Sequence, residues 1–367
     1  MPASDGRSTM HALRITSLHM LCAAEPSQNL ADDVRHRPLA GTRAWIITDG
    51  KTGMDVQCKG VADALGVAYE MKPVTPKGIW KALAPWGRVA PGDSFGHAGS
   101  AFAPPWPAIA IASGRASIPY IRALKRKAGS ATFTIVLQDP KTGASTADLI
   151  WVGDHDRLRG ANVVTTITSP HSFSAKRLAE LSASPPANIA ALPQPRVAVI
   201  LGGKNAVYKY TDADDDKLVA ALTSLAGLGA SFLITPSRRT HDRLLRKVNE
   251  ATAMSPRILW NGTGANPYAD FLANADMLIV TADSVNMTGE ACATGKPVYV
   301  FTPSAGSKKF DRFHQALQAY GATRPLPEWF GGIEHWAYRP LDSAAIIAAE
   351  VERRWLQTRA HVTPNHA

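Results

Sequence analysis

Residues 266–301 carry the side chains that a site for a phosphorylated ligand requires. An apolar run ends at Thr281, and Asp283 and Ser284 follow where the next helix is expected to begin. The free amides at the start of such a helix favour an anion such as a diphosphate, and Ser284 can add a hydroxyl donor. Glu290 lies about two turns into the helix, where a carboxylate can accept two hydrogen bonds from the vicinal hydroxyls of a ribose. The alternative is that Asp283 caps the helix and Glu290 is a solvated acid.

Two further polar groups follow apolar runs in the same half of the chain. Residues 197–201 lead into Gly202-Gly203-Lys204-Asn205, a short turn in which the backbone can approach a diphosphate while Lys204 neutralises its charge. The spacing is not that of a Walker A loop, and the alternative is a tight turn with a surface lysine. Residues 232–235 lead into Ser237-Arg238-Arg239, where a guanidinium fork suits phosphate oxygens. Because adjacent side chains rarely face the same way, we expect only one arginine to reach a ligand; the alternative is a solvated basic pair.

Repeated α/β units must position these residues. Apolar runs of strand length, most of them followed by polar or glycine residues, occupy residues 44–48, 108–112, 132–137, 149–152, 197–201, 232–235, 257–260, 277–281 and 296–302. Ligands bind at the carboxyl ends of the strands in open parallel sheets. Between the two series, four prolines within residues 182–195 predict a linker. The sequence therefore predicts two similar α/β domains.

Composition limits the class of protein. The chain has 367 residues, of which 45% are hydrophobic and 19% charged, enough for two packed cores. Its net charge of +10 favours phosphate-rich partners, although the basic residues could simply solvate the surface. Three distant cysteines without a C-x-x-C pair argue against a disulfide framework or a zinc site and fit a reducing cytosol. No run approaches the ~18 apolar residues that span a bilayer, and residues 15–24 make a poor signal peptide.

A larger set of residues, in this order along the chain, resembles one family. It comprises Thr48-Asp49-Gly50, Gly53, Gln57, Ser113-Gly114-Arg115, Gln138-Asp139-Pro140, His155-Asp156, Gly202-Gly203-Lys204-Asn205, Ser237-Arg238-Arg239, Asn266-Pro267-Tyr268, Asp283-Ser284-Val285-Asn286-Met287 and Glu290-Ala291. From about residue 43 to residue 355 the chain resembles the ELM1-like family, named for a plant mitochondrial-fission factor, whose bacterial members are regarded as glycosyltransferases. Residues 266–301 resemble the donor half of GT-B glycosyltransferases, in which a glutamate of this helix holds the nucleotide ribose.

The resemblance implies an α/β, GT-B-like fold with two Rossmann-like domains whose parallel sheets face a central cleft. We expect a flexible leader (1–39), an acceptor-side domain (40–181), the linker (182–195), a donor domain (196–325), a segment and helix that pack back across the domains (326–358), and a tail (359–367). The donor site would comprise Gly202, Gly203, Lys204, Asn205, Ser237, Arg238, Arg239, Asn261, Tyr268, Asp283, Ser284, Met287 and Glu290. Residues 261–268 would frame the base, with core packing as the alternative for Tyr268.

The implied activity is metal-independent transfer of a sugar from a nucleotide-sugar to a cell-envelope saccharide or a lipid-linked acceptor. The alternative is a non-catalytic adaptor that binds a nucleotide or protein partner at a membrane surface. An inverting transfer needs a general base, for which Asp49 is the first candidate, followed by His155 and Asp156, with turn capping as the alternative for each. The expected acceptor side comprises Gly50, Gly53, Gln57, Gly114, Arg115 and Asp139.

No metal or other cofactor is expected beside the nucleotide-sugar co-substrate. Asp154-His155-Asp156 has the D-x-D form and residues 212–216 are rich in acids, but the first lies in the wrong domain for the donor and the second matches a helix start. Residues 119–127, with four basic side chains, are the candidate contact with an anionic membrane, and a solvated basic face is the alternative. The absence of a recognised nucleic-acid module argues against nucleic acid as a partner. We expect a cytoplasmic protein, peripheral on the inner face of the membrane.

Overall fold

The computed structural model describes residues 37–360. The expected leader, residues 1–39, and tail, residues 359–367, therefore lie almost wholly outside the described residues. Within residues 37–360, no helix is both long enough and apolar enough to cross a membrane.

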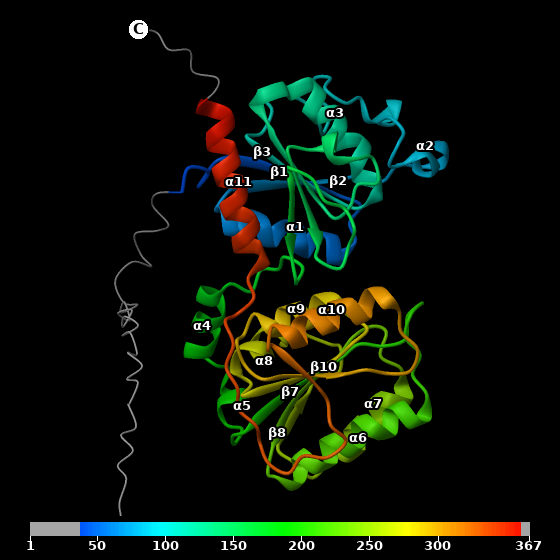
Figure 1. The fold of residues 1–367 in the computed structure, drawn as a ribbon, viewed down its shortest axis with the longest axis vertical. Helices are drawn as coiled ribbons and strands as arrows, with labels where there is room; N and C mark the ends of the chain where they lie inside the picture. Colours follow the sequence, from blue (N-terminus) through cyan, green and yellow to red (C-terminus); the bar gives the residue numbers. More distant parts are fainter. Residues whose placement is uncertain (1–36, 361–367) are drawn as a thin grey trace, which may run out of the picture. The chain divides into compact units, whose positions relative to one another are not determined.

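The first half of the chain forms a parallel six-stranded sheet in the order β2-β1-β3-β4-β5-β6 (Figure 1). Its strands are β1 (Arg43–Thr48), β2 (Ala68–Pro73), β3 (Ile109–Ser113), β4 (Phe133–Leu137), β5 (Leu149–Gly153) and β6 (Val163–Thr166). Successive strand residues enter different cores: Ile46 packs with α1 (Thr52–Leu65) and α11 (Ser343–Ala360), whereas Ile47 packs with α3 (Ile118–Ala128). Because both faces are covered, the central strands β3, β4 and β5 are buried at every residue and mainly apolar, as the sequence indicated. A short helix, α2 (Gly78–Leu83), buries none of its residues.

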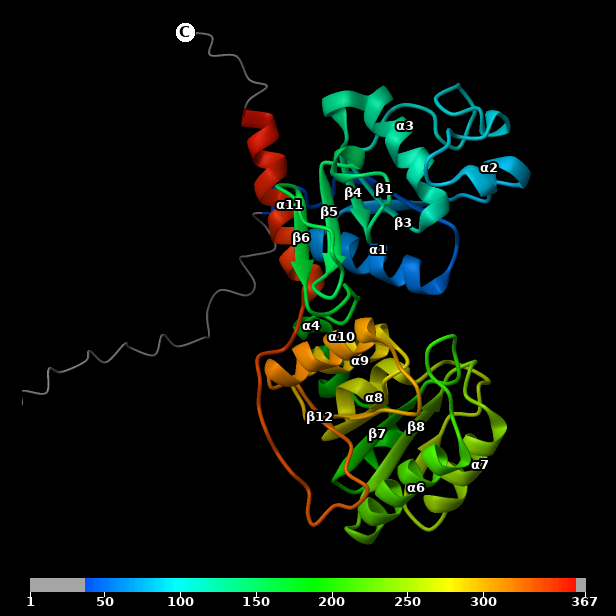
Figure 2. The same ribbon diagram turned by 45° about the vertical axis from the view of Figure 1, so that its right-hand side comes forward.

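The second half forms another parallel six-stranded sheet, in the order β12-β11-β10-β7-β8-β9 (Figure 2). Its strands are β7 (Arg196–Leu201), β8 (Ser231–Pro236), β9 (Arg257–Leu259), β10 (Met277–Thr281), β11 (Val298–Phe301) and β12 (Thr323–Pro325). One face packs on α4 (Ala175–Ala183), α8 (Tyr268–Asn274), α9 (Val285–Cys292) and α10 (Lys308–Ala319). The opposite face packs on α6 (Asp212–Gly227) and α7 (Asp242–Ala251). The expected α/β class with two Rossmann-like parallel sheets is confirmed.

The strand orders locate the crevice in each sheet. In the first, the order reverses between β1 and β3, and in the second between β7 and β10. Side chains that follow these four strands lie where doubly wound folds bind their ligands. Asp49 and Gly114 flank the first switch point, and Gly202 and Asp283 flank the second.

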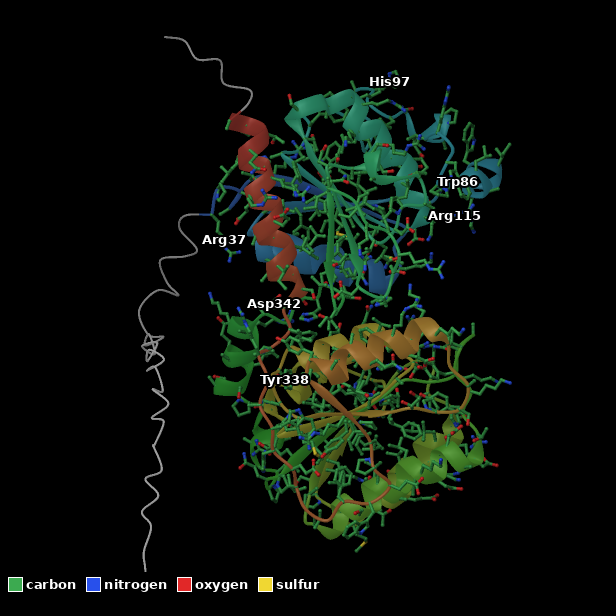
Figure 3. All side chains as sticks on the ribbon, in the orientation of Figure 1. Arg37, Trp86, His97, Arg115, Tyr338 and Asp342 are labelled. Atoms are coloured by element: carbon green, nitrogen blue, oxygen red, sulfur yellow. The ribbon has the colours of Figure 1, made fainter. Side chains whose placement is uncertain are left out.

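Residues 182–195 and helix α11 each contribute side chains to a hydrophobic core. Residues 182–195 contain α5 (Ala187–Ala190), and Ile189 is buried in the core of the second half because its side chain faces that sheet. Helix α11 returns to the first half, where Ile347 and Val351 enter the core beside α1. Asp342, labelled with Tyr338 in Figure 3, caps this helix by accepting a hydrogen bond from the Ala345 amide at 3.0 Å.

Candidate functional site

Asp283 lies at the second switch point with its carboxylate buried. Its Oδ1 accepts hydrogen bonds from the hydroxyls of Thr281 at 2.7 Å and Tyr210 at 2.8 Å. Its Oδ2 accepts from the Gly203 amide at 3.0 Å and from Nη2 of Arg239 at 2.8 Å. Burial, with Asp283 beside it, raises the pKa of Tyr210, so the phenol remains a donor. Asp283 therefore joins the loops after β7, β8 and β10, and its four contacts are all internal.

The two glycines of the β7 loop are required by close packing inside the protein. A Cβ on Gly202 would stand 2.0 Å from Oδ1 of Asp283, and one on Gly203 would stand 1.9 Å from the Arg239 carbonyl oxygen. Asn205 shapes the same loop, because its Oδ1 accepts from the amides of Val207 and Tyr208, both at 2.7 Å. Lys204 is exposed and has no ion-pair partner among the described residues. Of this turn, Lys204 alone presents its side chain to solvent with its charge available.

Ser284 caps α9. Its hydroxyl oxygen accepts a hydrogen bond from the Met287 amide at 3.3 Å. As the alternative to ligand binding, the sequence suggested that Asp283 caps this helix. Ser284 has that role, and the Asp283 carboxylate accepts a hydrogen bond from the β7 loop instead.

A cavity of about 430 Å³ opens at the carboxyl ends of β7 and β8 and beside the end of β9. We call it the donor cavity. Its lining comprises Thr52, Ile200, Leu201, Thr235, Pro236, Ser237, Arg238, Trp260, Asn266, Tyr268, Met287 and Glu290. It therefore brings together five residues of the expected donor site, which are Ser237, Arg238, Tyr268, Met287 and Glu290.

Glu290 is the acid of the donor cavity. It is 8% exposed, and its Oε2 accepts a hydrogen bond from the Tyr268 hydroxyl at 2.6 Å. Burial raises the pKa of Glu290 to about 7, against the opposing effect of the Tyr268 hydrogen bond. The carboxyl group thus changes its protonation state near neutral pH, and its ionised form can accept hydrogen bonds from ligand hydroxyls.

The adjacent arginines diverge. Arg239 pairs with Asp283, whereas Arg238 lines the donor cavity. Among the described residues, Arg238 has no ion-pair partner, so its guanidinium charge is available to a ligand.

Asn261 does not line the cavity. Its Oδ1 accepts a hydrogen bond from the Thr263 amide at 3.0 Å and shapes the loop. Asn266, which lies in the segment expected to frame the base, does line it, and so does Trp260, which we did not place in the expected site. The sequence signal for Trp260 was its position at the carboxyl end of the predicted strand 257–260.

A second cavity, of about 370 Å³, is lined by residues of both halves; we call it the junction cavity. Its lining comprises Gln57, Gln138, Asp139, Lys141, Trp151, Gly153, His155, Asp156, Ser169, Val285, Asn286, Lys309, Phe310 and Phe313. Beside it, Nε2 of Gln138 donates to Oε1 of Gln57 at 3.0 Å, and Nε2 of Gln57 donates to Oδ1 of Asn286 at 3.3 Å. Three uncharged amides thus link the two halves.

Helix α9 contributes to both cavities. Val285 and Asn286 in its first turn line the junction cavity, whereas Met287 and Glu290 line the donor cavity. Gly53 lies near this helix, since a Cβ there would stand 3.3 Å from Nδ2 of Asn286. A ligand group that passed from one cavity to the other would therefore pass the amino-terminal turn of α9, whose amides favour negative charge.

The three base candidates occupy different environments. Asp49 forms an ion pair with Lys51, and its buried Oδ1 has no hydrogen-bond partner among the described residues; it lines neither cavity. Asp156 lines the junction cavity but forms an ion pair with Lys309 at 2.7 Å. His155 lines the same cavity, and its Nδ1 has no partner in the described part of the chain. Burial lowers the pKa of His155 against the effect of Asp156, so a neutral imidazole that can accept a proton is favoured.

The remaining acceptor-side residues divide by position. Gln57 and Asp139 line the junction cavity. Gly50 and Gly114 have φ values of 77° and 92°, which favour glycine, in the loops that flank the first switch point. Arg115 lines neither cavity; it donates to the Ala82 carbonyl at 2.8 Å and therefore holds the end of α2.

The acid-rich segment 212–216 has structural partners. Asp214 completes a capping box with Thr211, and Asp215 contacts Nε of Arg243 at 2.7 Å. Residues 37–360 contain no group of three histidine, cysteine or acidic side chains arranged to hold a metal ion.

Comparison with known proteins relates the chain to one protein family. The family model described as mitochondrial fission ELM1 matches residues 52–355. The mitochondrial fission protein ELM1 of Arabidopsis thaliana is 28% identical over 271 residues, which cover 67% of this chain and 64% of that protein. The protein RP120 of Rickettsia prowazekii is 33% identical over 157 residues, which cover 41% of this chain and 44% of that protein. The chain thus spans less than two thirds of the length of either relative. Among solved structures, Acinetobacter baumannii MurG gives a TM-score of 0.46 at 13% identity, over 88% of this chain and 96% of that chain.

Proposed function

The chain belongs to the mitochondrial fission ELM1 family, and from that premise we propose that it is a nucleotide-sugar-dependent, metal-independent glycosyltransferase. The observation that carries the proposal is the donor cavity, in which the Glu290 carboxyl group and the Arg238 guanidinium group line one space at the carboxyl ends of parallel strands. A carboxylate suits the vicinal hydroxyls of a ribose, and a guanidinium suits a diphosphate. The acceptor would be a cell-envelope saccharide or a lipid-linked sugar in the junction cavity.

The proposed reaction uses groups that both cavities provide. The acceptor hydroxyl oxygen forms a bond to the anomeric carbon while the bond from that carbon to the phosphate oxygen breaks, and the nucleoside diphosphate leaves with the electron pair. The hydroxyl proton passes to a base, for which we favour His155 over Asp49 because His155 lines a cavity and has an unpartnered ring nitrogen. The amides of α9 and the charge of Arg238 stabilise the leaving diphosphate, and Lys204, which lines neither cavity, would add its charge from the β7 loop.

Titration calorimetry with UDP, GDP, CMP and their sugar conjugates tests the proposal. We expect one nucleotide to bind the wild-type chain, and we expect Glu290→Ala to weaken that binding by roughly tenfold or more, since a hydrogen bond to a charged group contributes about 1.5–3 kcal/mol. Absence of binding at millimolar nucleotide would remove the donor site. Unchanged affinity in the variant would remove Glu290 from ribose binding.

The two arginines provide a matched comparison within the same titration. Arg238→Ala is expected to weaken nucleotide binding by roughly 10- to 100-fold, because it removes a charged donor, and to leave the denaturation midpoint near that of the wild type. Arg239→Ala is expected to lower the midpoint, because it leaves the buried Asp283 carboxylate without its ion pair. An equal loss of affinity in the two variants at unchanged stability would contradict this division of roles.

One observation favours a second candidate function. The Arabidopsis relative bears the name of a mitochondrial fission protein, and a non-catalytic adaptor that binds a nucleotide or a protein partner at a membrane surface would fit that name. Turnover separates the two candidates. Release of free nucleotide from a nucleotide-sugar, dependent on a cell-envelope extract, supports the transferase, whereas binding without release supports the adaptor.

A further inference from the structure

The segment that contains α2 exposes large apolar side chains in the first half of the chain. Ile79 is 65% exposed, Leu83 45% and Trp86 63%. We define the α2 surface as these three residues together with Lys77, Lys81 and Arg88, which are also exposed. We propose that the α2 surface docks on a bilayer that contains anionic lipids. Such docking goes beyond nucleotide binding and does not depend on it.

The charge of this segment complements an anionic membrane. Between Glu70 and Asp93 the sequence has four basic residues and no acidic residue. Lys72 pairs with Glu70, but Lys77, Lys81 and Arg88 have no ion-pair partner among the described residues. Basic side chains near an anionic leaflet add to binding, and lysine stems can lie along apolar surface with the ammonium group in water.

Trp86 is exposed but held in place. Its indole Nε1 donates to the Lys141 carbonyl at 3.2 Å, and Arg115 lies 5.7 Å from its ring centroid (Figure 3). Its own carbonyl accepts from Nη1 of Arg122 at 3.1 Å. Since these contacts already order the Trp86 side chain, its insertion into the bilayer interface costs little further side-chain conformational entropy. Tryptophan is also the residue type enriched where apolar and polar phases meet.

The same contacts move the expected membrane contact away from α3. Arg122 donates to the α2 segment, and Lys125 forms an ion pair with Asp148 at 2.9 Å. Two of the four basic side chains expected to face lipid in residues 119–127 are therefore used within the protein. The unpaired cations of the α2 surface alternate along the sequence with its exposed apolar residues, and cations together with apolar groups are what an interfacial site requires.

Docking there would also place the junction cavity near the membrane. The Lys141 carbonyl holds Trp86, and Lys141 is also one of the residues that line the junction cavity. If the acceptor of the proposed function is lipid-linked, its head group would reach this cavity from the docked face. This consequence rests on the proposed function, whereas the docking itself does not.

Vesicle binding of the full chain, without nucleotide, tests the proposal. The probes are vesicles of equal parts phosphatidylcholine and phosphatidylglycerol, compared with vesicles of phosphatidylcholine alone, in a co-sedimentation titration. We expect binding to the mixed vesicles and little to the neutral ones. The double variant Lys77→Gln and Lys81→Gln is expected to bind the mixed vesicles roughly 25-fold more weakly. The matched control is Lys176→Gln with Lys217→Gln, which removes the same charge from exposed positions elsewhere and should bind like the wild type.

Tryptophan variants test the apolar part of the surface. Trp86→Ala is expected to weaken binding on the order of tenfold. Trp329→Ala is the control, because Trp329 is 74% exposed but lies between Glu328 and Glu334 in the sequence and should not face anionic lipid.

Several outcomes would overturn the proposal. They are equal binding to neutral vesicles, an equal effect of the control variants, or an absence of vesicle binding. A second copy of the chain is the other partner that could dock on the α2 surface, and sedimentation of the lipid-free protein tests for it. Self-association that Trp86→Ala abolishes, without vesicle binding, would make this surface a contact between copies of the chain. Nucleotide calorimetry without lipid stays a separate measurement, so failure of the donor site and failure of the docking surface are distinguishable.

Discussion

Replacement of Asp283 by alanine is expected to lower the free energy of unfolding by about 2–5 kcal/mol, because donors inside the protein lose their acceptor, at about 1–3 kcal/mol each. The lost carboxylate accepts four hydrogen bonds, from Thr281, Tyr210, Gly203 and Arg239. Tyr210 and the Gly203 amide would then lack an acceptor inside the protein. Urea denaturation, followed by the shift of the midpoint at constant slope, measures the change.

Asp216→Ala is the matched control for this variant. Asp216 also forms an ion pair, with Lys247 at 2.5 Å, but it lies on the exposed face of α6. An exposed pair contributes about 0–1 kcal/mol, so this change should hardly move the midpoint. A wild-type midpoint for Asp283→Ala, combined with loss of nucleotide binding, would show that the carboxylate serves a ligand and would refute the structural role.

Glu290→Gln is expected to make stability less dependent on pH and to stabilise the protein in alkaline solution. The pKa of Glu290 rises from 4.5 in the unfolded chain to about 7 in the folded one. A raised pKa in the folded state means that the contribution of the group is complete below pH 4.5 and is lost as the pH rises through 7. This difference in pKa between the two states corresponds to about 3 kcal/mol of unfolding free energy, since one pKa unit corresponds to about 1.4 kcal/mol. The variant should therefore match the wild type near pH 4.5 and exceed it by about 3 kcal/mol near pH 8.

Tyr268→Phe serves as a directional control for the titration. The Tyr268 hydroxyl donates to Glu290 and opposes the rise of its pKa. Its removal should therefore shift the pH at which stability falls to a higher value, whereas Glu290→Gln should abolish that fall. Denaturation midpoints of the wild type and both variants, measured between pH 4.5 and 8, test this expectation. Parallel curves for wild type and Glu290→Gln would mean that Glu290 stays ionised throughout this range.

The central strands of both sheets could be predicted from the sequence, and most edge strands could not. Strands β2, β6 and β12, which we did not predict, each lie at an edge of a sheet. An edge strand is covered less completely than a central one, so its sequence lacks a continuous apolar run. The β2 sequence, Ala-Tyr-Glu-Met-Lys-Pro, shows this directly, since none of its residues is buried.

For the candidate site, position along the chain was predictable and side-chain direction was not. The sequence places Asp283 after a strand, but its partners Tyr210 and Arg239 are 73 and 44 residues away. Only the folded arrangement shows that Asp283 binds these residues and that Arg238 is the arginine that lines the donor cavity. Glu290 and Tyr268, proposed for the same ligand, share a hydrogen bond that their spacing of 22 residues did not reveal.

The return of α11 to the first half has a consequence for the order of events during translation. Ile347 and Val351 complete the core that α1 begins, and no residue between α4 and α10 replaces them there. Roughly 280 residues separate α1 from α11, so at about 5–20 residues per second the ribosome needs on the order of fifteen to sixty seconds to supply the missing helix. The second sheet is synthesised within this interval. The half of the chain that is made first therefore finishes its core last, and until then the apolar face of α1 lacks the cover that Ile347 and Val351 provide.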